Sequence, residues 1–320
     1  MNTIGHIFKL TTFGESHGVA VGGVIDGCPS QLKLDFGFIE QELLRRKTAQ
    51  SSTSSQRKEP DQVEWLSGLL DGVTLGTPIA FMVRNEDCKT EDYEALKDVY
   101  RPSHADFTYE QKYGIRDWRG GGRASARTAL PIVVAGAIAK QILKEKGIQI
   151  MAQVTAMGDV EQARREGDTV GGIVECRIKG VPAGLGEPMF GKFSAELAHA
   201  MFSLPAVKGF EIGDGFVSAK MRGSEANDTF VNKNGKIATL TNHSGGIQGG
   251  ITDGDDIVFR VAFKPIPSIA QPQKTVNRAG ETCQIAIEGR HDVCALPRAV
   301  VLVEALAAMV TLDMAMLHRL

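Results

Sequence analysis

The sequence predicts an α+β fold, in one large domain of 320 residues or in two closely joined ones. Short apolar runs with strand-like alternation and longer runs with helical spacing both occur along the chain. They do not follow the strict alternation of strand and helix that is typical of a doubly wound parallel sheet. Hydrophobic residues make up 42% of the chain, which is enough for a sizeable core.

The first half of the chain predicts strands, one helix and a polar loop. Residues 36–46 place Phe36, Ile39 and Leu43 on one face of a helix, with Asp35 as its N-cap. The stretch 47–59 is almost wholly polar, so we expect a mobile loop or lid there. The strand-like runs of this half are 7–12, 19–25 and two within 66–83.

The second half predicts two long buried helices separated by strands. Residues 124–146 are rich in Ala, Val and Ile, and Pro131 is expected to start or kink this helix. Residues 297–320 are apolar on most sides, with Pro297 near the N1 position of a closing helix. The remaining elements are strands at 170–178 and 257–263, a helix at 195–202 and a glycine-dense loop at 235–254.

Charge and cysteine content argue against several classes of protein. With 36 basic and 38 acidic residues the net charge is −2, which disfavours nucleic-acid binding through a global positive field. The five cysteines form no CxxC pair and no metal-ligand motif occurs, so we expect neither a disulfide framework nor a metal site. A signal peptide and a run of about 18 apolar residues are also lacking, which predicts a cytoplasmic protein without a membrane span.

Histidines and arginines gather in glycine- and serine-rich segments that do not resemble core. The turn Gly14-Glu15-Ser16-His17-Gly18 is one, and Arg101-Pro102-Ser103-His104-Ala105-Asp106 is another. Histidine titrates near neutral pH, and arginine offers a planar fork of donors for phosphate or carboxylate. Either segment alone could equally be a solvated turn, and we interpret His6, His199 and His318 as structural.

The segment 119–127, Arg-Gly-Gly-Gly-Arg-Ala-Ser-Ala-Arg, gives a stronger signal because it opens the helix predicted at 124–146. Amide groups at a helix N-terminus, with glycines beside them, form an anion cradle. The pattern is neither a P-loop nor a dinucleotide fingerprint. We expect phosphate binding here, with a glycine hinge as the alternative. Arg45-Arg46-Lys47 could bind a ligand or merely complement a helix dipole.

Several motifs, taken in order, resemble the chorismate synthase family over essentially the whole chain. They are GESHG (14–18), RPSHAD (101–106), YGIRDWRGGGRASAR (113–127), VPAGLGEP (181–188), AVKGFEIGDGF (206–216), SGGIQGG (244–250), GRHD (289–292) and PRAV (297–300). The resemblance implies one β-α-β sandwich domain over 1–320 and a homotetrameric, cytoplasmic flavoprotein. The implied reaction is a lyase step of the shikimate pathway, 1,4-elimination of phosphate from 5-enolpyruvylshikimate 3-phosphate to give chorismate. It would use reduced FMN that is not net consumed, with NADPH as a candidate reductant.

The same resemblance implies roles for individual residues. His17 and His104 match the catalytic histidines, His104 near the leaving phosphate and His17 near the N1/C2 edge of the flavin. Ser16 and Asp292 match residues that assist proton removal through flavin N5. Substrate- or NADP-facing positions map to Arg46, Arg101 and Arg127, and FMN contacts map to Arg123, Ala124, Ser125, Pro205, Ala206, Gly249, Lys264, Pro265, Ile266, Pro267, Ser268 and Arg290.

The chain departs from the family pattern at several positions. Thr48-Ala49 stand where Pro-Gly is usual, and Ser52 and Ile132 each stand where the family has an arginine. Thr128 replaces a glutamate, and Pro205 stands where asparagine is common.

The stretch 158–167 is also shorter than in typical members, and a mobile loop is expected around 158–168. The departures motivate an alternative, a catalytically impaired flavin- or phosphate-ligand-binding protein of the same family. A third hypothesis, an RNA-binding protein that uses Arg-Gly loops, is disfavoured by the net charge and by the low aromatic content of 6%.

Overall fold

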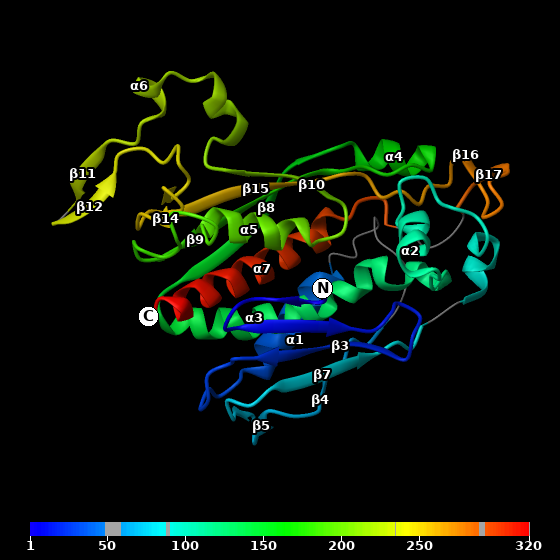
Figure 1. The fold of residues 1–320 in the computed structure, drawn as a ribbon, viewed down its shortest axis with the longest axis horizontal. Coiled ribbons are helices and arrows are strands. Elements are labelled where there is room, and N and C mark those ends of the chain that lie inside the picture. The colour runs from blue at the N-terminus through cyan, green and yellow to red at the C-terminus, as the bar shows by residue number, and fades with distance from the viewer. Residues whose placement is uncertain (49–58, 88–89, 234, 288–291, 320) are drawn as a thin grey trace.

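A computed structural model describes residues 1–48, 59–87, 90–233, 235–287 and 292–319. A layer of helices lies between two antiparallel sheets (Figure 1), one of five strands and one of four. The predicted α+β class and the β-α-β sandwich are confirmed.

The N-terminal sheet has the strand order β1-β2-β3-β7-β4. Strand β2 (Lys9–Phe13) pairs with β3 (Ala20–Asp26) across the turn at 14–18, and β3 pairs with β7 (Ile79–Arg84). Side chains of β7 alternate, with Ile79, Phe81 and Val83 buried, so one face of this sheet packs on the helices. The short strands of this region are β1 (Thr3–Ile4), β4 (Glu64–Trp65), β5 (Leu69–Leu70) and β6 (Val73–Thr74).

The second sheet has the order β10-β15-β9-β8. The predicted strands at 170–178 and 257–263 are β9 (Gly172–Lys179) and β15 (Ile257–Phe263). Strands β8 (Gln149–Met157) and β10 (Val207–Ile212) flank them at the sheet edges and were not predicted. Most side chains of β8 are exposed, so its sequence lacks the apolar alternation of a half-buried strand.

The four predicted helices are confirmed as α1 (Phe36–Thr48), α3 (Leu130–Glu145), α5 (Phe193–Phe202) and α7 (Leu296–Leu317). Asp35 caps α1, because its Oδ1 accepts a 2.9 Å hydrogen bond from the Phe38 amide. Pro131 lies in the first turn of α3, so it starts this helix and does not kink it. Residues 124–129, predicted as helix, instead contain the end of one short 3₁₀ turn, η2 (Arg119–Ala124), the extended residue Ser125 and a second 3₁₀ turn, η3 (Ala126–Ala129).

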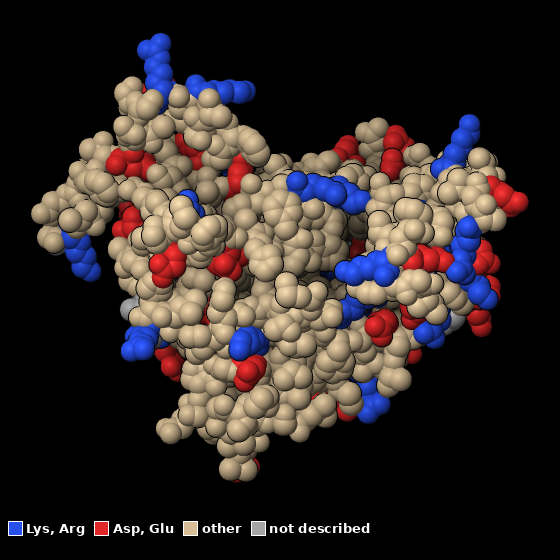
Figure 2. All heavy atoms as spheres, in the orientation of Figure 1, with Lys and Arg blue, Asp and Glu red and all other residues tan. Residues whose placement is uncertain are grey.

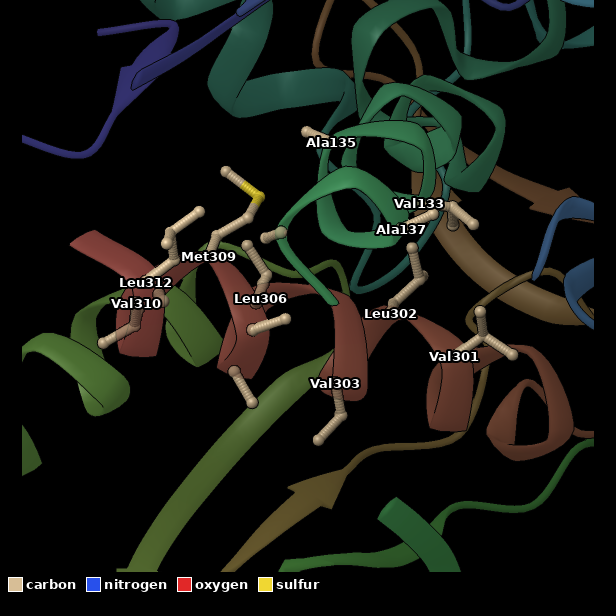
Figure 3. Close-up of a cluster of buried hydrophobic side chains, with 14 of the residues drawn as sticks. Val133, Ala135, Ala137, Val301, Leu302, Val303, Leu306, Met309, Val310 and Leu312 are labelled. Carbon is tan, nitrogen blue, oxygen red and sulfur yellow. The ribbon is translucent and has the colours of Figure 1, made fainter. Parts of the chain in front are cut away.

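The central contact of the core joins α3 and α7. Leu302 and Leu306 of α7 point toward α3, while Val303 points away from it (Figure 3). The helices approach very closely at Gly136, where an added Cβ would lie 2.3 Å from the Cβ of Ala305. By length and composition the segments Arg119–Glu145 and Leu296–Leu317 could each cross a membrane, but most of each is buried inside this fold.

A buried ion cluster ties α1, α3 and α7 together. Glu304 of α7 accepts from Arg45 Nη1 at 2.7 Å and from Lys140 Nζ at 2.6 Å. Its other oxygen accepts from the Ala152 amide of β8 at 3.0 Å. Burial alone would raise the pKa of Glu304, but its cationic partners outweigh that effect and the pKa is lowered. The cluster therefore fixes the C-terminal end of α1, where Arg46 follows Arg45.

Smaller elements surround the sandwich. Residues 158–168, predicted as a loop, contain the helix α4 (Val160–Glu166), because Asp159 caps its start and Gly167 adopts a left-handed φ of 66° at its end. The predicted loop at 235–254 contains short hairpin strands. Of the polar stretch 47–59, residues 49–58 lie outside the described residues. The other elements are η1 (Thr90–Leu96), α2 (Asp106–Tyr113), η4 (Gly215–Lys220), α6 (Gly223–Ala226), β11 (Phe230–Lys233), β12 (Lys236–Thr239), β13 (Ile247–Gln248), β14 (Ile251–Thr252), β16 (Gln273–Val276) and β17 (Thr282–Ile285).

Replacing Gly136 by Ala tests the contact between α3 and α7. Alanine gains about 1 kcal/mol of helix propensity, but overpacking costs about 1–3 kcal/mol. We expect the free energy of unfolding, measured by urea denaturation, to fall by about 1–2 kcal/mol. Gly223→Ala is the control, because an added Cβ there meets nothing within 4 Å. A Gly136→Ala protein as stable as the original would contradict this close packing.

Candidate active site

A cavity of about 760 Å³ lies at the end of the helical layer where α3 and α7 begin and where α1 and α5 end. Lys and Arg side chains lie beside the hollow between the regions of α5 and α2 (Figure 2). The predicted site residues that line the cavity are Ser16, Arg46, Arg101, His104, Arg123, Ala124, Ser125, Arg127, Pro205, Ala206, Lys264, Ile266, Pro267, Ser268 and Asp292. The structure therefore brings together segments that are far apart in the sequence.

Three of the predicted residues do not line this cavity, and a fourth is not described. Pro265 and His17 are not among the lining residues, and Arg290 lies outside the described residues. Gly249 lies in the turn between β13 and β14, where the neighbouring Gly250 carbonyl accepts from the amide of Phe193 at the start of α5. The cavity lies at the other end of α5. Because this helix has ten residues, that end is about 15 Å from the turn that contains Gly249.

His104 belongs to a buried cluster of charged side chains. Its Nδ1 lies 2.9 Å from Oδ1 of Asp106. The two oxygens of the Asp106 carboxylate also accept one 2.7 Å hydrogen bond each from Arg101, and Oδ1 accepts a third from Arg116. Burial lowers the pKa of His104, and the hydrogen bond to Asp106 offsets this only in part. The imidazole is therefore neutral at pH 7, with Nδ1 held toward Asp106 and Nε2 directed toward Gly121.

The glycine run at 120–122 has a different role from the predicted helix-terminal cradle. All three residues adopt a positive φ, which favours glycine, and α3 begins only at Leu130. An added Cβ on Gly120 would lie 2.0 Å from His17 Nδ1, and one on Gly121 would lie 3.3 Å from His104 Nε2. The glycines thus allow both histidines to lie against the backbone of this turn. The ring of His17 also contacts Tyr93 edge-on, with centroids 5.1 Å apart, and Tyr93 lines the cavity.

Buried arginines form the basic wall of the cavity. Arg46 donates to Asp61 Oδ2 at 2.9 Å, and Arg127 donates to Asp61 Oδ1 at 2.8 Å. Arg127 also donates to the Arg84 carbonyl at 2.9 Å and to the Asn85 side chain, so the protein itself holds most of its fork. Arg298 of α7 lies 3.3 Å from Asp292 Oδ1.

Arg123 and Lys264, two other predicted contacts, donate hydrogen bonds from their charged groups to backbone carbonyls. The guanidinium of Arg123 donates to the carbonyls of Thr12 and Gly14, at 3.0 and 3.2 Å. Lys264 Nζ donates to the Ser103 carbonyl at 2.8 Å, and its partial burial lowers the pKa of the amine. These side chains therefore hold the walls of the cavity together.

The departures from the family pattern can be located in part. The Thr128 hydroxyl donates to the carbonyls of Ser125 and Arg123 at 2.7 and 3.0 Å, so it caps the turn before α3. Ile132 lines the cavity and makes this part of its wall apolar.

Sequence reasoning missed several residues of the site. Asp61, Arg298 and His199 all line the cavity, although His199 was interpreted as structural. Arg298 lies in the PRAV motif, which is a usable signal. Asp61 follows a proline at the end of a polar stretch, and no pattern distinguishes it.

Comparisons with known proteins agree with this geometry. The family model for chorismate synthase matches residues 8–164 and 157–316. The chain is 51% identical to a chorismate synthase of Parabacteroides distasonis, over 100% of this chain and 99% of that relative. The chain belongs to the chorismate synthase family. A chorismate synthase of Porphyromonas gingivalis is also 51% identical, over 98% of this chain and 95% of the relative.

A crystal structure of a chorismate synthase shares the fold. Its TM-score is 0.78 at 29% sequence identity, and the match covers 98% of this chain and 93% of the other. As a member of the chorismate synthase family, the protein is a lyase of the shikimate pathway and of aromatic biosynthesis.

The chorismate synthase comparisons also bear on the length of the chain. The two pieces of the family match meet at residues 157–164. The alignment with the Parabacteroides relative spans 353 positions, against 320 residues in this chain. Both observations support a shortening at α4, which connects β8 and β9 here.

Replacing Asp106 by Asn tests how the site sets the protonation of His104. Burial and the charge of Arg101 would remain while the anionic partner is lost, so we expect the pKa of His104 to fall further. A pH titration of the ring by ¹⁵N NMR measures it, with a thermal melt to confirm folding. Asp98→Asn is the control, because the Asp98 side chain is exposed and its carboxylate lies 3.6 Å from Arg278. A His104 pKa that rises or stays the same would refute the assignment.

Proposed function

We propose that the protein converts 5-enolpyruvylshikimate 3-phosphate to chorismate by 1,4-elimination of phosphate, in the presence of reduced FMN. The single observation that carries the proposal is the cavity where buried arginines, His104 and Asp292 meet. Family membership supports the same reaction and favours it over an impaired binding protein.

The residues of the cavity fit a flavin and an anionic substrate. A volume of about 760 Å³ is in the usual range for small-molecule sites. Main-chain turns at 124–125, 205–206 and 264–268 approach the cavity, and Ala206 has a left-handed φ of 68° there. When bound, reduced FMN lends electron density to the substrate and receives it back, so it is not net consumed. The segments at 123–125, 205–206 and 264–268 would hold it.

The arginines supply the charge that the substrate requires. Two carboxylates and a phosphate need several cationic donors, and Arg46, Arg101 and Arg127 line the cavity. Because the buried fork of Arg101 is held by Asp106 and that of Arg127 by Asp61, their orientation is fixed before the substrate binds.

We propose that His104 protonates the leaving phosphate. It is neutral in the free protein, since burial lowers its pKa. A phosphate group beside it would raise that pKa by favouring the imidazolium. Binding of the substrate would therefore favour protonation of the His104 ring. The proton then passes from Nε2 to a phosphate oxygen as the carbon–oxygen bond breaks.

Asp292 and Ser16 serve the removal of the ring proton. Asp292 lines the cavity beside Arg298, which holds its carboxylate at 3.3 Å, and Ser16 is buried in the turn between β2 and β3. A carboxylate can accept a proton, and the serine hydroxyl can orient the group that carries it. The ring of His17 lies against Gly120, on the same side of this glycine as the Ser16 hydroxyl.

We also propose that the protein is a cytoplasmic homotetramer. A second subunit would allow the turn with Gly249, which lies at the far end of α5, to reach the cavity of a neighbour. NADPH is the proposed reductant of the flavin.

Anaerobic turnover with dithionite-reduced FMN tests the reaction. We expect chorismate and inorganic phosphate in equal amounts without net flavin oxidation, and no product with oxidised FMN. Repeating the assay in air with FMN and NADPH tests whether the protein reduces its own flavin. Binding of flavin and substrate without product would instead support the impaired alternative.

Replacing His104 by Ala should lower kcat by about 10²- to 10⁴-fold, the range for losing one acid–base group. Binding of FMN and substrate should stay nearly intact, because the arginines remain. Steady-state kinetics and flavin titration measure the two effects. His318→Ala is the control, since His318 caps the far end of α7. An unchanged kcat in the His104 variant would remove this residue from the mechanism.

A further inference from the structure

Asp61 lies at the junction of two arginines of the cavity. Its side chain is 4% exposed, and its two oxygens accept separately from Arg46 and Arg127, at 2.9 and 2.8 Å. Arg46 comes from the end of α1 and Arg127 from the turn before α3. One carboxylate therefore sets the distance between two cations that belong to different elements.

The backbone at Asp61 is held in an uncommon conformation. Its φ of 54° lies in the left-handed region, which few non-glycine residues adopt, although aspartate adopts it more readily than most. Glu59, two residues before Asp61, anchors the segment: its carboxylate accepts from the amides of Glu86 and Asp87 at 3.0 and 3.2 Å. Strain that persists in a buried cavity wall is typical of positions that serve function.

The charged groups around Asp61 include a second carboxylate, that of Glu59, which lies 3.7 Å from Arg127 Nη2. Burial alone would raise the pKa of Asp61, but Arg46 and Arg127 outweigh it and the pKa is lowered, so the group remains a carboxylate. Burial lowers the pKa of Arg46, and Asp61 opposes that effect while Arg298 and Arg127 add to it. The side chain of Arg46 is 8% exposed, and its Nε has no hydrogen-bond partner among the described residues. Donor capacity is thus left over at this wall, on Arg46.

We propose that Asp61 is a positioning residue for substrate binding, which holds Arg46 and Arg127 so that their remaining N–H groups face the anionic groups of the substrate. This role rests on the proposed function. Asp61 does not act as a base, because both its oxygens are engaged by guanidinium groups.

Asp61→Asn keeps the shape of the side chain and removes its charge. A hydrogen bond to a charged group contributes about 1.5–3 kcal/mol, so we expect KM for 5-enolpyruvylshikimate 3-phosphate to rise about 10- to 100-fold. We expect kcat at saturation to change less than about threefold, since interactions that bind ground state and transition state equally affect KM alone. Glu64→Gln is the matched control, because Glu64 pairs with the exposed side chain of Arg84 on the same sheet.

A double-mutant cycle with Arg46→Gln keeps the proposal testable if a single variant is poorly folded. If Asp61 acts through Arg46, Asp61→Asn should raise KM much less in the Arg46→Gln background than alone. Asp61→Glu, which restores the charge, should recover part of the affinity. Additive effects, or a fall in kcat at unchanged KM, would overturn the proposal.

Binding of inorganic phosphate, followed by ³¹P NMR, separates this proposal from the proposed reaction. If the protein without substitutions forms no chorismate, the proposed reaction is refuted. Weaker phosphate binding in Asp61→Asn than in Glu64→Gln would still support the positioning role, and equal binding in the two variants would overturn it.

Discussion

The close contact between α3 and α7 is the constraint on which the site depends. At Gly136 no side chain separates the helices, so their first turns lie together at one end of the molecule. The segments that precede them, 119–129 and 292–295, must therefore enter the same cavity. The ion cluster of Glu304 adds the end of α1 and with it Arg46. The arrangement of the core thus decides which loops meet, before any ligand is considered.

A second constraint acts locally at the turn 120–122. Positive φ values and two histidines against the backbone leave room for glycine only. A side chain at Gly120 would displace His17, and one at Gly121 would push on His104. The glycines of this turn leave space for the two imidazole rings. From the sequence alone, the same glycines predicted an amide cradle for phosphate. Ser125 and Thr128 use the nearby polar groups to cap the turns before α3.

Elements with a clear period could be predicted from the sequence, and the others could not. Strand β15 alternates between buried and partly exposed side chains and was predicted with its exact bounds, whereas β8 is exposed along most of its length and carries no such pattern. In the site, motif residues such as His104 and Arg127 could be named in advance. Asp61 could not, because its role arises from two arginines that approach it only after folding.

The distribution of charge explains how the site can present isoleucine at position 132, where the resemblance predicts an arginine. Position 132 carries isoleucine, and its place on the cavity wall shows that one lost arginine is replaced by apolar surface. A buried cation is costly unless it is paired, so each additional arginine requires a partner such as Asp61. Arg46 and Arg127 share the carboxylate of Asp61, Glu59 lies 3.7 Å from Arg127, and Arg298 is paired with Asp292. Fewer arginines, each held by a carboxylate, can still present an ordered set of donors, because orientation and not charge alone determines how well a guanidinium binds an anion.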